Sequence, residues 1–83
     1  MNAEIKRALY LNDEELLEEI LDARPDLANL KIDEERNVRI IHKASQIENA
    51  NLITMLIEKG ADIDVQDSNL WTPIMIAAMN GNL

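Results

Sequence analysis

Two short apolar segments repeat each other along this chain, and the repetition limits the folds that it can adopt. The segment LLEEIL at 16–21 places apolar residues at positions i, i+1, i+4 and i+5, and LITMLI at 52–57 has the same spacing 36 residues later. On a helix this spacing forms one broad apolar stripe. Internal periods of this length indicate a stack of similar units, none of which can bury its own apolar face alone.

A second relation links the middle of the chain to its last residues. RIIHKAS at 39–45 aligns without a gap with TPIMIAA at 72–78, at an offset of 33. Ile41 then corresponds to Ile74, and Ala44 corresponds to Ala77. Large and small apolar positions therefore recur together, and the small ones allow close approach of neighbouring helices.

Local signals divide each unit into two helices. Asn12 is suited to cap a helix that begins at Asp13, and Pro25 marks the end of that helix. Gly60 suits the left-handed position that follows a later helix. The unit is therefore a short helix, a turn, a second helix and an extended loop, with helices expected at about 3–11, 13–24, 41–47 and 51–59.

The composition restricts the core and the chemistry. Among 83 residues there are two Gly, two Pro, no Phe and no Cys. Tyr10 and Trp71 are the only aromatic residues, so the core must be aliphatic. Without cysteine there is neither a disulfide nor a thiolate metal site, and we expect an intracellular, cytoplasmic protein. No apolar run is long enough for a signal peptide or a transmembrane helix.

The net charge argues against two classes of partner. Sixteen acidic residues and eight basic ones give the chain a formal charge of −8. Nucleic acids and anionic membranes both require a basic surface, so neither is an expected partner. The acids are expected mainly to solvate a helical surface.

The C-terminal third carries an ordered set of motifs. GADID at 60–64 is followed by Asp67, then by TPIMIAA at 72–78 and NGNL at 80–83. In composition, order and spacing these residues closely resemble the ankyrin repeat, whose mark is a 33-residue period with a T-P-L-H-x-A run. The resemblance implies an all-α solenoid of paired antiparallel helices with short hairpin-like loops. About two and a half repeats are expected.

The resemblance also implies how the chain is divided. Residues 1–83 form a single array, with a degenerate first repeat at 3–36, a second repeat at 39–71 and the first helix of an incomplete third repeat at 72–83. About three extra residues are expected in the loop near 30–37. Leu70 occupies a position that is usually Gly in the family, and its counterpart is Asn37. We expect either that the native chain continues beyond Leu83 or that a partner completes the array.

Several polar residues could suggest chemistry. His42 and Ser45 lie one helical turn apart, but the resemblance implies that His42 instead binds loop backbone between units. Asp62, Asp64 and Asp67 do not match a calcium loop, because the required glycine and glutamate are absent from their positions. We therefore predict no catalytic residue, no metal ligand and no cofactor site, and interpret these aspartates as turn formers.

A cluster of glutamates leaves a second interpretation open. Glu14, Glu15, Glu18 and Glu19 lie on the polar side of the 16–21 stripe, near a helix N-terminus where acids are favourable. They are expected to be a solvated face, and the alternative interpretation is an acidic patch for a basic partner.

The function implied by the resemblance is protein–protein recognition by a rigid concave surface, without catalysis. Trp71 is either an exposed anchor or packed against the adjacent loop, and both interpretations stay open. The alternatives are an assembly element completed by another chain, by dimerisation or helix exchange, and a regulatory segment of a larger enzyme. The predicted partner-binding residues are Trp71, Ser68, Asn69, Met79 and Asn80, with Val38, Gln46 and Ile47 as their counterparts one unit earlier.

Overall fold

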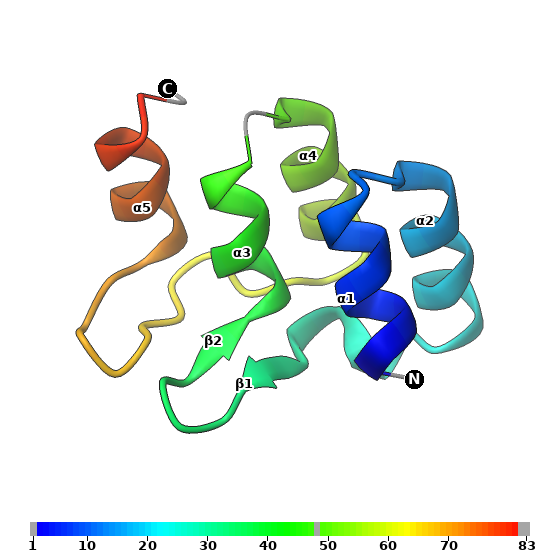
Figure 1. Ribbon diagram of the computed structural model, residues 1–83, viewed down its shortest axis with the longest axis horizontal. Coiled ribbons are helices and arrows are strands. Elements are labelled where there is room, and N and C mark those ends of the chain that lie inside the picture. Colours follow the sequence, from blue (N-terminus) through cyan, green and yellow to red (C-terminus); the bar gives the residue numbers. More distant parts are fainter. Residues whose placement is uncertain (1, 48, 82–83) are drawn as a thin grey trace.

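Helices make up most of the computed structural model, which describes residues 2–47 and 49–81 (Figure 1). The helical architecture predicted from the sequence is confirmed. In chain order the elements are α1 (Asn2–Tyr10), α2 (Glu14–Ala23), the 3₁₀ helix η1 (Pro25–Asn29), β1 (Lys31–Asp33), β2 (Val38–Arg39), α3 (Ile40–Gln46), α4 (Ala50–Glu58) and α5 (Pro73–Met79).

The helices are arranged as a stack of antiparallel pairs. A short turn joins α1 to α2, and α3 and α4 form a second pair of neighbouring helices (Figure 1). Helix α1 packs against α2, while α3 packs against both α4 and α5. The stack runs from α1 to α5, so the N-terminal and C-terminal ends of the array lie at opposite ends of the molecule (Figure 1).

The turn between α1 and α2 corrects one prediction. Asp13, not Asn12, caps α2, because the Asp13 carboxylate accepts a hydrogen bond from the Leu16 N–H at 3.1 Å. Asn12 instead adopts a left-handed backbone with φ of 56°. Its side-chain oxygen accepts a hydrogen bond from Asn49 Nδ2 at 2.7 Å, and Asn49 caps α4. The two caps are thereby joined across neighbouring helix pairs.

The helix boundaries differ slightly from the predicted ones. Helices α3 and α4 begin at Ile40 and Ala50, one residue earlier than expected. Pro25 does more than end α2, because it also begins η1, where its fixed φ suits a first helical position. Gly60 has the predicted left-handed conformation, with φ of 100°.

The loop between the two helix pairs forms a small β hairpin. Strands β1 and β2 pair in antiparallel fashion, with Lys31 opposite Arg39 and Asp33 opposite Val38. The pairing is irregular between Lys31 and Asp33, within the segment expected to hold extra residues. Asn37 at this hairpin and Leu70 in the next loop both have positive φ, 55° and 67°.

The core is aliphatic, as predicted. None of the buried residues in the described part of the chain is a Phe, Tyr or Trp. Ile57, at the edge of the predicted stripe, remains 47% exposed, and Ala77 is buried while the adjacent Ala78 is exposed. The largest apolar side chains with almost no exposure are Ile5, Leu17, Leu21, Ile40, Ile41, Leu52 and Leu56.

None of the helices within residues 2–47 and 49–81 is long and apolar enough to span a membrane.

Candidate functional site

His42 joins the start of α3 to the following loop. Its Nδ1 accepts a hydrogen bond from the Arg39 N–H at 3.0 Å, so the proton lies on Nε2. Nε2 then donates to the carbonyl oxygens of Val65 and Trp71, at 3.0 and 3.1 Å. The side chain is completely buried. The predicted structural role of His42 is confirmed, and its ring nitrogens are both engaged by the backbone.

Two of the three aspartates of the 62–67 loop, Asp62 and Asp67, act as turn formers as predicted, whereas Asp64 takes part through its backbone N–H. The Asp62 carboxylate accepts from the Asp64 N–H at 2.9 Å. The Asp67 carboxylate accepts from the N–H groups of Asn69 and Trp71, both at 2.9 Å. Within the described residues, no three His, Asp or Glu side chains are grouped to hold a metal ion.

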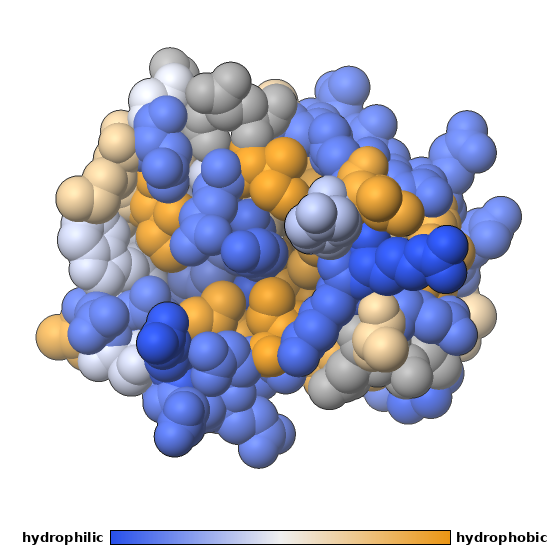
Figure 2. Space-filling view, viewed as in Figure 1, coloured by the Kyte–Doolittle hydropathy of each residue, from blue (hydrophilic) through white to orange (hydrophobic). Residues whose placement is uncertain are grey.

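A groove of about 510 Å³ lies between α1, the β hairpin and α3. We call it the hairpin groove. Figure 2 shows that this face of the molecule combines apolar patches with strongly hydrophilic surface. The groove is lined by Lys6, Leu9 and Tyr10 from α1, by Ile32, Asp33, Arg36 and Val38 from the hairpin region, and by Lys43 and Gln46 from α3.

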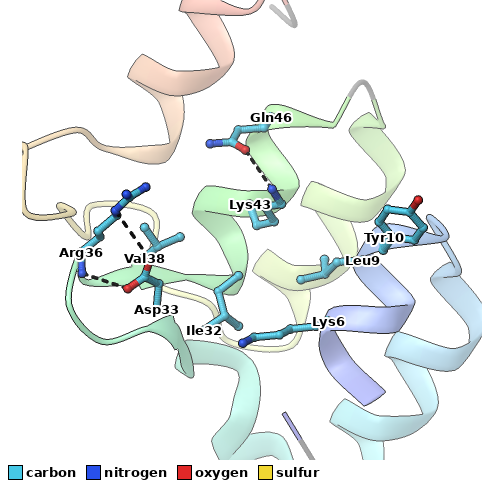
Figure 3. Close-up of a pocket in the computed structure, with 9 residues that line it drawn as sticks. All are labelled: Lys6, Leu9, Tyr10, Ile32, Asp33, Arg36, Val38, Lys43 and Gln46. Atoms are coloured by element: carbon cyan, nitrogen blue, oxygen red, sulfur yellow. Dashed lines mark hydrogen bonds and ion pairs between the residues drawn. The ribbon is translucent and has the colours of Figure 1, made fainter. Parts of the chain in front are cut away.

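The hairpin groove has an apolar floor and a basic rim. Leu9 is buried and Ile32 and Val38 are half-buried, whereas Lys6, Arg36 and Lys43 are exposed. In the close-up, Lys6 extends across the groove toward the hairpin (Figure 3). Lys43 Nζ donates to Gln46 Oε1 at 3.4 Å.

One acid lies in the hairpin groove, and it is already engaged. The Asp33 carboxylate accepts from the Arg36 N–H at 3.1 Å and lies 3.9 Å from the Arg36 guanidinium (Figure 3). Three bases and one acid therefore line the groove of a chain whose net charge is −8.

The structure brings only some of the predicted binding residues together. Val38 and Gln46 line the hairpin groove, and Ser68 contacts the Arg36 carbonyl from the next loop. Ile47 is half-buried against the core. Asn69, Met79 and Asn80 are exposed outside the groove. Their role in binding stays a prediction.

Trp71 is neither fully exposed, as a partner anchor would be, nor fully packed against the adjacent loop. The residue is half-buried, and its backbone is held on both sides. Its N–H donates to the Asp67 carboxylate, and its carbonyl accepts from the Asp67 N–H at 3.0 Å as well as from His42. The backbone of Trp71 is thus fixed whether or not its side chain contacts a partner.

A second groove, of about 310 Å³, lies between α3, α4 and α5. We call it the end groove. Ile57, Ile63 and Ile74 line it and are 47%, 51% and 63% exposed. Apolar surface is therefore exposed at this end of the stack. The remaining lining residues are Ile41, Ser45, Ile53, Asp64, Pro73 and Ala77.

Sequence reasoning missed most of the hairpin groove, although a charge signal was present. Helix α2 has five acids and no base, whereas α1 has Lys6 and Arg7 against Glu4. Helix α3 has Lys43 and no acid, and α5 has no charged residue. The acids therefore gather on one helix of the first pair and the bases on the other. The missed residues are Lys6, Leu9, Tyr10, Ile32, Asp33, Arg36 and Lys43.

Paired antiparallel helices joined by projecting loops define a helical repeat protein. A family model described as ankyrin repeats (3 copies) matches residues 5–83, and the chain belongs to this family. Ankyrin repeats are generally protein–protein interaction modules. The division into repeats at 3–36, 39–71 and 72–83 stays a prediction.

The chain is similar to short parts of two larger kinds of protein. It is 35% identical over 75 residues to Potassium channel AKT1 from Oryza sativa, in both subspecies indica and japonica. It is 34% identical over 76 residues to Probable E3 ubiquitin-protein ligase XBOS31 from Oryza sativa subsp. japonica. These matches cover 90% and 92% of this chain but only 8% and 17% of the relatives. No solved structure matches the chain.

Proposed function

We propose that this chain is a protein-interaction module without catalysis of its own, and that it binds a protein partner along the hairpin groove and the 65–71 loop. The observation that carries the proposal is the hairpin groove itself, which combines half-buried apolar side chains with exposed polar ones. Its surroundings are held by the bonds of His42 and by the contact of Ser68 with Arg36. A surface held in place before binding loses less conformational entropy when a partner docks.

Photo-crosslinking tests this proposal. A photoreactive amino acid would replace Gln46 or Ser68 on the proposed surface, and Glu18 on the exposed face of α2 as the control. Ultraviolet irradiation in an extract of the source cells should join one discrete protein to the first two variants and not to the third. Crosslinks from Glu18 alone, or from none of the three positions, would refute the proposed surface.

The two full-length relatives suggest a context in which such binding could serve. One is a potassium channel and the other a probable ubiquitin-protein ligase, and each contains a matched segment as a small part. We propose for this chain, likewise, a role as the recognition part of a larger system, including regulation of an enzyme. An intracellular, cytoplasmic location belongs to the same proposal.

Self-association is a second candidate, favoured by the end groove. The exposed fractions of Ile57, Ile63 and Ile74 leave apolar surface that a second copy could cover. Light scattering at several concentrations tests this idea, with Ile74→Glu as the variant. A wild-type dimer that Ile74→Glu converts to a monomer would support self-association, and a monomeric wild type would exclude it.

A further inference from the structure

The distribution of charge over the helices is uneven, and it points to the chemistry of the partner. The acids of the first helix pair are concentrated on α2, which has no base, and Glu58 is the sole charged residue within α4. The bases Lys6, Arg7 and Lys43 lie on α1 and α3, which carry the walls of the hairpin groove. The hairpin groove is therefore a basic site on an acidic molecule.

Two of the groove's bases are available for a new charged partner. The described structure gives Lys6 no hydrogen bond or ion pair, and Lys43 contacts only the neutral Gln46 amide, at a long 3.4 Å. Arg36 faces Asp33 at 3.9 Å, with 77% of its side chain exposed. Glu34 and Glu35, at the tip of the same hairpin, are exposed and do not line the groove.

The floor of the groove adds an apolar requirement. Leu9 is buried and Ile32 and Val38 are half-buried among the lining residues, and Tyr10 lies at the α1 side of the groove with 88% of its surface exposed (Figure 3). A volume of about 510 Å³ accommodates a few side chains. A ligand that fits must therefore place an apolar side chain on the floor and carboxylates near Lys6 and Lys43.

We propose that the hairpin groove binds a short acidic peptide segment of the partner protein, with an apolar residue set between aspartates or glutamates. This inference rests on the proposed function and deepens it by naming the chemistry of the partner. Carboxylates near the two lysines gain charge-assisted hydrogen bonds. The apolar residue packs on the groove floor, where its surface is removed from water. The acidic surface of the rest of the chain repels acidic peptides elsewhere and so directs them to this groove.

NMR titration of the ¹⁵N-labelled full chain tests the proposal with three synthetic decapeptides. The first alternates glutamate with leucine, the second replaces each glutamate by lysine, and the third replaces each leucine by serine. The first should bind and shift the amide signals of Lys6, Val38 and Lys43, while the other two should bind on the order of tenfold more weakly or not at all. Its affinity should fall as salt rises from roughly 0.05 M to roughly 0.5 M.

Matched variants locate the charge effect. Lys6→Gln and Lys43→Gln should each weaken binding several-fold. Arg7→Gln is the control and should not weaken it, because Arg7 is exposed on α1 beside Lys6 but does not line the groove. Equal binding of the lysine peptide, shifts confined to other parts of the chain, or no binding of the first peptide at millimolar concentration would overturn the inference. Tighter binding of a single-stranded oligonucleotide through the same two lysines would also overturn it.

The two proposals fail separately. A partner that crosslinks from Gln46 or Ser68 through a segment without acidic residues would refute the acidic-peptide inference and leave the interaction function intact. Binding of the first peptide together with failure of every crosslink in the source-cell extract would refute the proposed function instead.

Discussion

Ser68 binds the carbonyl oxygen of Arg36 twice, through its backbone N–H at 2.7 Å and through its hydroxyl at 3.0 Å. These residues lie 32 positions apart, at the tips of successive loops. Since Arg36 also lines the hairpin groove, one wall of the groove depends on the loop of the following unit. A residue predicted to bind a partner thus has a structural contact as well.

Ser68→Ala should separate the two bonds. The hydroxyl bond is lost and the backbone bond remains, so the free energy of unfolding should fall by no more than about 1 kcal/mol at this exposed position. Hydrogen exchange measures the local effect, and the Ser68 amide should stay protected. Full loss of that protection would show that the hydroxyl, and not the backbone, holds the two loops together.

His42→Ala should destabilise the array strongly. The change removes the acceptor for the Arg39 N–H and the donor to the carbonyls of Val65 and Trp71. The His42 side chain is completely buried, so its loss leaves these backbone groups without their partner. We expect the free energy of unfolding to fall by about 2–4 kcal/mol, measured by urea denaturation. Amides of α5 should exchange faster. Lys43→Ala is the control on the same helix, and equal effects of the two changes would contradict this role for His42.

Leu70→Gly should stabilise the chain. Leu70 has φ of 67°, where a side chain with a Cβ is strained, and it is 65% exposed, so little apolar burial is lost. Relief of the strain, offset by the greater backbone entropy of unfolded glycine, should raise the free energy of unfolding by up to about 1 kcal/mol. Asn37→Gly is the control and should gain less, because asparagine tolerates positive φ better. A loss of stability in Leu70→Gly would show that its side chain packs productively.

The Asp22–Lys59 ion pair should make stability depend on pH at the alkaline end. The hydrogen bond to Asp22, with the negative charges of Asp22, Glu18 and Glu58 adding to it, raises the pKa of Lys59. A raised pKa means a stabilising contribution that is complete below the ordinary lysine pKa of about 10.4 and is lost as the pH rises through the folded value. Asp22→Asn should therefore lower the urea midpoint near neutral pH and differ less from wild type at a pH above the raised pKa of Lys59, where its amine is neutral. A difference that grows at alkaline pH would contradict this sign.

The local signals in the sequence were accurate where one residue type decides the conformation. Thr72 caps α5 and Pro73 occupies its first turn, as their chemistry predicts. Asn12 shows the limit of such signals, because an asparagine suits both a cap and a left-handed turn, and Asp13 beside it suits the cap equally well. The choice between them depends on how the second helix packs, which a local pattern does not contain.

The sequence by itself determined the repeated helical fold, the aliphatic core and the structural role of His42. The fold follows from the repeated apolar spacing, the aliphatic core from the composition, and the role of His42 from the resemblance to the ankyrin repeat. Only the tertiary structure decided that Lys6, Ile32 and Lys43 share one groove, because these residues come from three elements whose relative positions arise from packing. The same packing gathers three basic side chains in this groove, so a chain with an excess of acids presents a basic groove.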